Sequence, residues 1–155
     1  MLTGRSVSLP RAIAACLEEA FGESVAHVRI VEHSLFARLH LRAVATTRRR
    51  RIYLRGSSDA FFGNPWLMLH EYCHVLKQWE CRALTTPRYL FECLRRGYWD
   101  NRFEVEARAF ADTHLSRVVA ALRRAASSTE QRLTMVEAPR DEHEHGPQRE
   151  RDADR

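Results

Sequence analysis

The spacing of apolar side chains along the chain predicts a mixture of helices and short strands in the first third. Residues 10–21 place apolar side chains at helical spacing and end before Gly22, a residue type that commonly terminates helices. Apolar and polar residues alternate over residues 25–31, which favours a strand, and residues 34–41 fit a short helix. Residues 43–54 contain two short apolar stretches around a run of arginines, so we expect two short strands or one irregular hairpin.

Helices are expected to dominate the rest of the body. A loop over residues 57–64 leads into a helix over residues 65–79, with Asn64 as its N-cap and Pro65 in its first turn. A second helix runs over residues 87–97. Its predicted apolar stripe comprises Tyr89, Leu90, Cys93 and Leu94. The pattern as a whole is typical of an α+β fold with more helix than sheet.

The helix over residues 65–79 carries the motif H-E-x-x-H as His70-Glu71-Tyr72-Cys73-His74, between apolar neighbours. Residues four apart lie on one face of an α-helix, about 5–6 Å from each other, so both imidazoles can bind one tetrahedral metal. The motif is typical of zinc hydrolases, in which Glu71 is the general base for a zinc-bound water. An accidental match on a structural helix is the alternative. Cys73 is turned about 100° from His74, so we expect it to pack.

A third ligand is expected on a long helix that begins near residue 101. Glu104 lies on the apolar face of this helix, whereas Glu106 shares a polar face. Burying a carboxylate without a partner is costly, so Glu104 needs a compensating cation, and zinc supplies it. Together with the two histidines, Glu104 completes the three-ligand set of a catalytic zinc site. An ion pair with Arg108 or with another arginine at the start of the helix is the alternative for Glu104.

Charge is distributed unevenly over the 155 residues. The net charge is +5, but residues 137–155 carry 7 acidic and 4 basic residues, which leaves +8 on the remainder. Few core residues occur after residue 125, so we expect one domain over residues 1–125 and a disordered tail over residues 126–155. The four arginines of residues 48–51 could bind the phosphates of a nucleic acid. We expect no nucleic-acid partner, because charged side chains on a hairpin also prevent edge-to-edge pairing between sheets.

The location predicted from the sequence is the cytoplasm. No apolar signal region precedes the first helix, and the four cysteines show no C-x-x-C spacing, so we expect reduced thiols. The apolar runs are far shorter than the roughly 20 residues that span a bilayer, which predicts no membrane partner. Nothing in the sequence indicates an oligomeric state.

Two stretches resemble known families. Short segments from Ala20 to Leu54, together with the stretch Leu69–Gln78 around the H-E-x-x-H motif, resemble the eCIS core domain family of metallopeptidase-type domains found with bacterial extracellular contractile injection systems. This resemblance covers residues 9–80 and implies a zincin-like fold with a metal. The stretch Phe103–Ala111 is similar to the third-ligand helix of gluzincins such as the CAAX prenyl proteases. Glu104 matches its ligand, whereas Arg108 stands where that pattern has an acidic residue.

We therefore interpret the chain as an α+β, mostly helical zincin-like domain with a small sheet and a disordered C-terminal tail. The predicted function is zinc-dependent hydrolysis of peptide bonds in a peptide or protein substrate. Residues 52–54 are expected to line the substrate cleft. Tyr98 or His114 is a candidate oxyanion donor, although packing is the simpler role for each. The alternative is an inactive, zinc-stabilised binding module associated with a contractile injection system.

Overall fold

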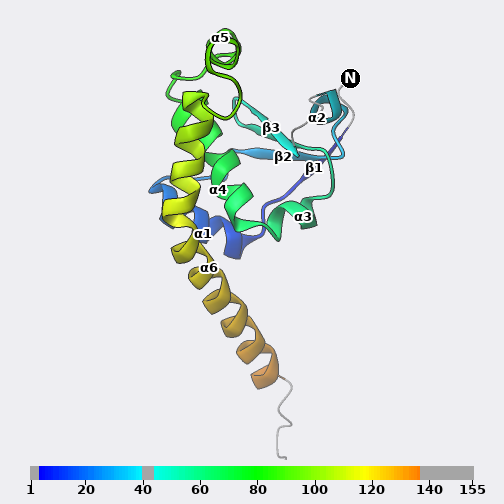
Figure 1. The fold of residues 1–155 in the computed structure, drawn as a ribbon. Helices are drawn as coiled ribbons and strands as arrows, with labels where there is room; N and C mark the ends of the chain where they lie inside the picture. Colours follow the sequence, from blue (N-terminus) through cyan, green and yellow to red (C-terminus); the bar gives the residue numbers. More distant parts are fainter. Residues whose placement is uncertain (1–3, 40–43, 137–155) are drawn as a thin grey trace, which may run out of the picture.

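The sheet of this protein is small and mixed. The computed structural model describes residues 4–39 and 44–136. Four strands lie in the spatial order β1-β2-β4-β3, with β2 parallel to β4 and both outer strands antiparallel to their neighbours (Figure 1). Their bounds are β1 (Arg5–Val7), β2 (Arg29–Glu32), β3 (Ala45–Arg48) and β4 (Arg51–Leu54). The predicted hairpin is thus confirmed as β3 and β4, and β3 is an edge strand with an unpaired backbone on one side.

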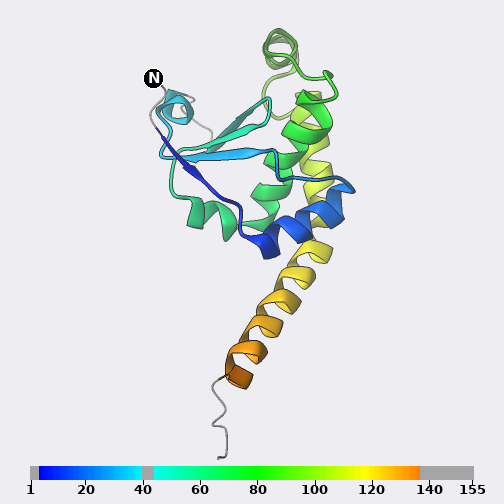
Figure 2. The same cartoon turned by 180° about the vertical axis from the view of Figure 1, so that it is seen from behind.

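The helices are α1 (Arg11–Phe21), α2 (Leu35–Leu39), α3 (Ser58–Phe62), α4 (Pro65–Cys73), the π-helix η1 (His74–Trp79), α5 (Thr86–Arg96) and α6 (Arg102–Val136). Most helices lie on the face of the sheet that carries Ile52, whereas α2 contacts the opposite face through Phe36 and Tyr53. Both views show α4 between the sheet and α6, and α1 is also packed against α6 (Figures 1 and 2). The α+β class with a helical majority is confirmed.

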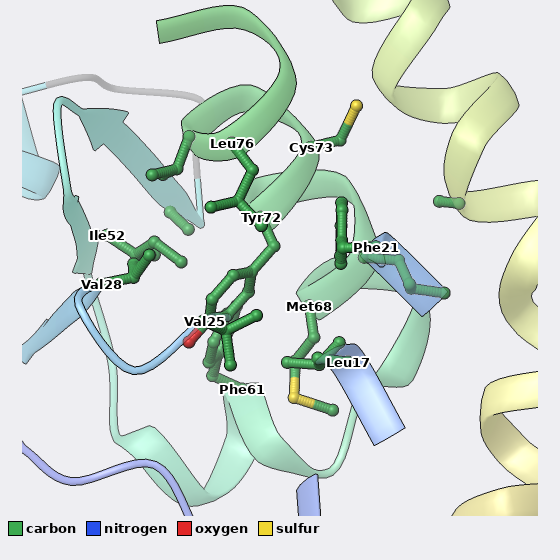
Figure 3. Close-up of a cluster of buried hydrophobic side chains, with 14 of the residues drawn as sticks. Leu17, Phe21, Val25, Val28, Ile52, Phe61, Met68, Tyr72, Cys73 and Leu76 are labelled. Carbon is green, nitrogen blue, oxygen red and sulfur yellow. The ribbon is translucent and has the colours of Figure 1, made fainter. Parts of the chain in front are cut away.

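The hydrophobic core is built around α4. Met68, Tyr72 and Leu76 lie in a cluster with Leu17 of α1 and Ile52 of β4 (Figure 3). Each of these side chains is at most 1% exposed. Full burial of a large apolar side chain contributes about 1.5–3 kcal/mol, so these contacts fix α4 against the sheet and α1. A helix held on several sides presents its remaining face at a defined position, and that face carries the histidines.

The start of α4 matches its prediction, but its end does not. Asn64 Oδ1 accepts a hydrogen bond from the backbone N–H of Leu67 at 3.0 Å, and Pro65 occupies the first turn. A single α-helix to Trp79 was expected, whereas the chain changes to a π-helix at His74. Gln78 is fully buried and donates to the Phe103 carbonyl of α6 at 2.9 Å, a contact between distant segments that accompanies the wider turn.

Two elements were absent from the expectations. The short edge strand β1 exists through pairing with β2, a contact that no local pattern reveals. The loop predicted over residues 57–64 contains α3, whose N-cap Ser57 accepts from the N–H of Ala60. The predicted helix over residues 34–41 is α2, and its last two residues lie outside the described part of the chain.

The apolar stripe predicted on α5 faces the body of the protein only in part, because Tyr89 contacts Glu104 and Cys93 contacts Asn101. Leu90 is 56% exposed and Leu94 is 89% exposed, while Glu92 on another face of the helix is buried. This helix protrudes beyond the end of α6 at which that helix begins (Figure 1). An apolar side chain is buried only where another element covers it. The start of α6 covers the side of α5 that carries Tyr89, and no described element covers Leu94.

The predicted tail is partly helical. The helix α6 continues through Val136, past residue 126, where the tail was expected to begin. Ser127, Ser128 and Thr129 donate to the carbonyls four residues earlier, so their hydroxyls bond along the helix without any core contact. Residues 137–155 lie outside the described residues, and the domain boundary at residue 125 stays a prediction. None of the described helices is long and apolar enough to cross a membrane.

Candidate metal centre

The three predicted metal ligands come together in the structure. His70 lies in the last turn of α4, His74 begins η1, and Glu104 lies in the first turn of α6. One potential ligand atom from each residue lies within 4.8 Å of those from the other two. The two Nε2 atoms are 3.1 Å apart, and the Glu104 carboxylate lies 3.3 Å from Nε2 of His70 and 3.6 Å from Nε2 of His74. All three side chains are buried, so the cluster could hold a metal ion.

One unsatisfied polar atom at the cluster fits a bound cation. Glu104 Oε2 is buried and has no hydrogen-bond partner among the described residues. Buried polar atoms normally have hydrogen-bond partners. A metal bound between Glu104 and the two imidazoles would give this carboxylate oxygen a partner. The donor set of two imidazoles and one carboxylate is also that of catalytic zinc sites. The residues present therefore fit a metal ion.

The buried amide of Gln78 determines the orientation of His74. Its nitrogen donates to the Phe103 carbonyl at 2.9 Å and to Glu106 Oε2 at 2.9 Å. Both amide hydrogens are thereby used, so the contact of 2.7 Å between Gln78 Oε1 and His74 Nδ1 needs a hydrogen on Nδ1. The neutral ring then carries its lone pair on Nε2, the atom that faces His70 and Glu104.

A different contact positions His70. The indole of Trp66 stacks on the imidazole with 5.1 Å between ring centroids and 18° between the planes. Trp66 itself donates from Nε1 to Asp112 Oδ1 on α6 at 2.7 Å. The ring of His70 is therefore held by stacking, whereas that of His74 is held by a hydrogen bond.

The charges around the cluster favour a positive ion. Burial alone would raise the pKa of Glu104, but the imidazoles of His70 and His74 beside its carboxylate and the hydroxyl of Tyr89 hold the pKa well below its ordinary value. Burial alone would lower the pKa of His74, yet the carboxylates of Glu104 and Glu71 raise the pKa overall. The site thus keeps a carboxylate ionised in a buried position and stabilises positive charge on the nitrogen beside it.

Glu104 has a phenol, not an arginine, as its neighbour. Tyr89 donates from its hydroxyl to Glu104 Oε1 at 2.7 Å. The alternative ion pair with Arg108 is wrong, because that guanidinium donates to the Trp99 carbonyl and lies 5.4 Å from the centroid of the Trp99 ring. Among the described residues no arginine pairs with Glu104. Glu106 is exposed, as predicted from its position on a polar face. It accepts a hydrogen bond from Gln78, the residue that orients His74.

Glu71 borders the same hollow as the ligands. It is 6% exposed, and burial raises its pKa above the ordinary value of a carboxyl group, although the neighbouring histidines oppose this shift. The hollow is a cleft between the metal ligands, the edge strand β3 and α5. Its lining comprises Phe36, Ala45, Thr46, Thr47, Arg48, His70, Glu71, His74, Trp79, Leu84, Thr86, Tyr89, Leu90, Tyr98 and Glu104.

Several predictions around this cleft need correction. Residues 52–54 do not line it, because β4 is an interior strand and β3 forms the edge beside the metal ligands. Tyr98 does line the cleft. His114 does not: its ring stacks on the ring of Phe110, and its Nδ1 lies 2.9 Å from the Phe110 carbonyl oxygen, further along α6. Cys73 is buried, and burial raises its pKa to about 12, as expected for a packed thiol.

Sequence reasoning did not identify Gln78, Tyr89, Trp66 or Asp112. For Gln78 a signal existed, since it follows His74 by four residues, the spacing of neighbours on one helix face. The other three act through contacts between elements far apart in the chain, which spacing cannot reveal. All four cysteines are free thiols.

The fold and the cluster together define a small α+β domain with a candidate metal site. Over residues 8–82 the chain matches the family model of the eCIS core domain, which confirms the resemblance expected over residues 9–80. His70, Glu71 and His74 lie inside the matched stretch, whereas Glu104 lies outside it. No curated protein and no solved structure matches the chain.

Proposed function

We propose that this protein is a zinc-dependent peptidase whose metal is held by His70, His74 and Glu104. The observation that carries this proposal is the position of Glu71. A purely structural metal site needs no further carboxylate, yet Glu71 is buried at the same cleft as the three ligands. A zinc ion bound here would supply a Lewis acid that lowers the pKa of water and polarises a carbonyl group.

The chain's own residues supply the remaining functions. Glu71 takes a proton from the attacking water and passes it to the leaving amine. Tyr98 is at the cleft and is the candidate for a hydrogen bond to the oxyanion. The free edge of β3 offers backbone groups to an extended peptide, which would lie in the cleft as an additional strand.

A second candidate is a zinc-stabilised docking module associated with a contractile injection system. The match to the eCIS core domain supports this candidate more directly than it supports hydrolysis. An observation on α5 and on the turn after it also favours this candidate. Phe91, Leu94 and Trp99 are 62%, 89% and 72% exposed, and large apolar side chains exposed in this way are typical of contact surfaces. Under this proposal zinc contributes to folding and the surface binds the partner.

The two candidates differ in what the substitution Glu71→Gln does. We expect about one zinc per chain in the wild type, in Glu71→Gln and in the exposed control Glu23→Gln, with equal melting temperatures, because the substitution removes neither a ligand nor a core contact. The variants His70→Ala and His74→Ala should lose the metal. A peptide-library digest should then show chelator-sensitive cleavage by wild type and control, reduced at least about 100-fold in Glu71→Gln.

The outcomes separate the proposals. Equal turnover in wild type and Glu71→Gln would contradict the role of the base. Full zinc content with no cleavage of any peptide by either protein supports the docking module. Zinc retained in both histidine variants would contradict the metal site itself.

A further inference from the structure

Three arginines lie side by side across the sheet. Arg29 of β2 is the register partner of Arg51 of β4, and Arg51 is also the register partner of Arg48 of β3. Residues directly opposite on neighbouring strands project from the same face with Cβ atoms about 4.5–5.5 Å apart, and like charges in this position repel. All three side chains are exposed. The fold therefore concentrates positive charge in one row at the end of the sheet.

This row borders a groove that no carboxylate lines. The groove is formed by His27, Arg29, Phe36, Arg48, Arg49, Arg50, Arg51, Tyr53, Trp79 and Thr86. Glu80 stands nearby and is shared between His27, at 2.8 Å, and Arg50, at 3.7 Å. Within the described ranges, no carboxylate lies within ion-pair distance of the three row arginines. One acidic group against five arginines leaves a strong positive potential, which attracts anionic ligands.

The groove is continuous with the metal cleft. Both hollows share four lining residues: Phe36, Arg48, Trp79 and Thr86. Arg48 is the last residue of the edge strand β3, so a chain that pairs with β3 in the cleft reaches the arginines at the end of that strand. Its guanidinium lies 5.0 Å from the centroid of the Phe36 ring, at the junction of the two hollows. A ligand longer than the cleft thus extends over the row of arginines.

We propose that the arginine groove, defined by Arg29 and Arg48 to Arg51, binds an acidic segment of the polypeptide whose adjoining residues occupy the metal cleft. That this polypeptide is a substrate rests on the proposed peptidase function. A peptide fits both hollows, because an edge strand pairs with peptide backbone. A nucleic acid fits only the groove, since it has no peptide backbone to pair with β3 in the cleft.

The test measures binding without cleavage. Zinc-loaded Glu71→Gln protein is titrated with a labelled peptide that joins a β-forming half to a half rich in glutamate, and with a counterpart in which glutamine replaces each glutamate. We expect the acidic peptide to bind at least about tenfold more tightly at low salt, a preference that falls as salt rises. Single-stranded DNA of similar length serves as the rival ligand.

A charge-matched pair of variants locates the binding. The triple substitution Arg29→Gln, Arg48→Gln and Arg51→Gln should abolish the preference for the acidic peptide. The control Arg11→Gln, Arg95→Gln and Arg123→Gln changes the net charge equally at exposed positions outside both hollows, and should keep the preference within about twofold. Because the row substitutions relieve repulsion between opposite strand positions, their variant should melt no lower than the control.

The results distinguish this inference from the peptidase proposal. Equal losses in both triple variants, or DNA that outcompetes the acidic peptide through the row arginines, would overturn the acidic-segment proposal. Arginine-dependent binding of the acidic peptide together with a wild type that cleaves nothing would leave the groove intact and contradict only the peptidase. Cleavage that shows no preference for acidic peptides would support the peptidase and contradict the acidic-segment proposal.

Discussion

Replacement of Gln78 by leucine should weaken metal binding while leaving all three ligands in place. The side chain is fully buried, and its oxygen accepts from His74 Nδ1 at 2.7 Å. In the metal-bound state His74 must keep the hydrogen on Nδ1, and leucine leaves that hydrogen buried without an acceptor. An unsatisfied buried donor costs about 1–3 kcal/mol. In the metal-free state the ring can shift its hydrogen to Nε2, so most of this cost falls on the bound state.

The expected loss of zinc affinity is therefore about 10- to 100-fold, the range found for partners that orient metal-ligating histidines. Competition with a chromophoric chelator at neutral pH measures this loss on folded protein, and the absorption spectrum of the cobalt-substituted protein reports the ligand geometry. Leucine also removes the bonds to Phe103 and Glu106, so the metal-free variant should melt at a lower temperature. The affinity must be measured below that temperature.

The substitution Glu106→Gln is the matched control. It preserves an acceptor for the Gln78 amide on an exposed side chain, so zinc affinity should change by about threefold or less. Gln78→Leu with wild-type affinity and an unchanged cobalt spectrum would refute the argument that Gln78 orients His74. A loss in Glu106→Gln as large as that in Gln78→Leu would show that the charge of Glu106, and not the hydrogen on Nδ1, controls the site.

Two further predictions concern stability. Tyr72 is fully buried and its hydroxyl has no hydrogen-bond partner in the described part of the chain, so Tyr72→Phe should stabilise the fold by about 1–3 kcal/mol, and chemical denaturation that shows a loss would contradict this. Glu32 accepts from the Ser58 N–H and pairs with Arg5, contacts that lower its pKa from 4.5 to about 2. Because the folded pKa is the lower one, this stabilisation is complete above about pH 4.5 and is lost as pH falls toward 2. The melting-temperature difference between wild type and Glu32→Gln should shrink over that interval, and a difference independent of pH would exclude this linkage.

The local sequence determined the elements whose signals lie within a few turns of chain. The four-residue spacing of His70 and His74 needs only helical geometry, and Asn64 with Pro65 marks the helix start through contacts inside one turn. Helical periodicity also separated Glu104 from Glu106, because two residues are about 200° apart around a helix. These predictions depend on neighbours along the chain, so the sequence alone was sufficient for them.

Only the tertiary structure decided the features that join distant segments. Gln78 orients His74 because α6 brings Phe103 and Glu106 to its amide, and nothing local to Gln78 indicates that contact. The helical spacing of apolar residues on α5 predicted an inward face, but Leu90 and Leu94 on that face are exposed because no described element covers them. The row of Arg29, Arg51 and Arg48 follows from the register of three strands, including a parallel pair separated by a crossover. Local pattern fixes which face a residue occupies, whereas packing between elements decides what that face meets.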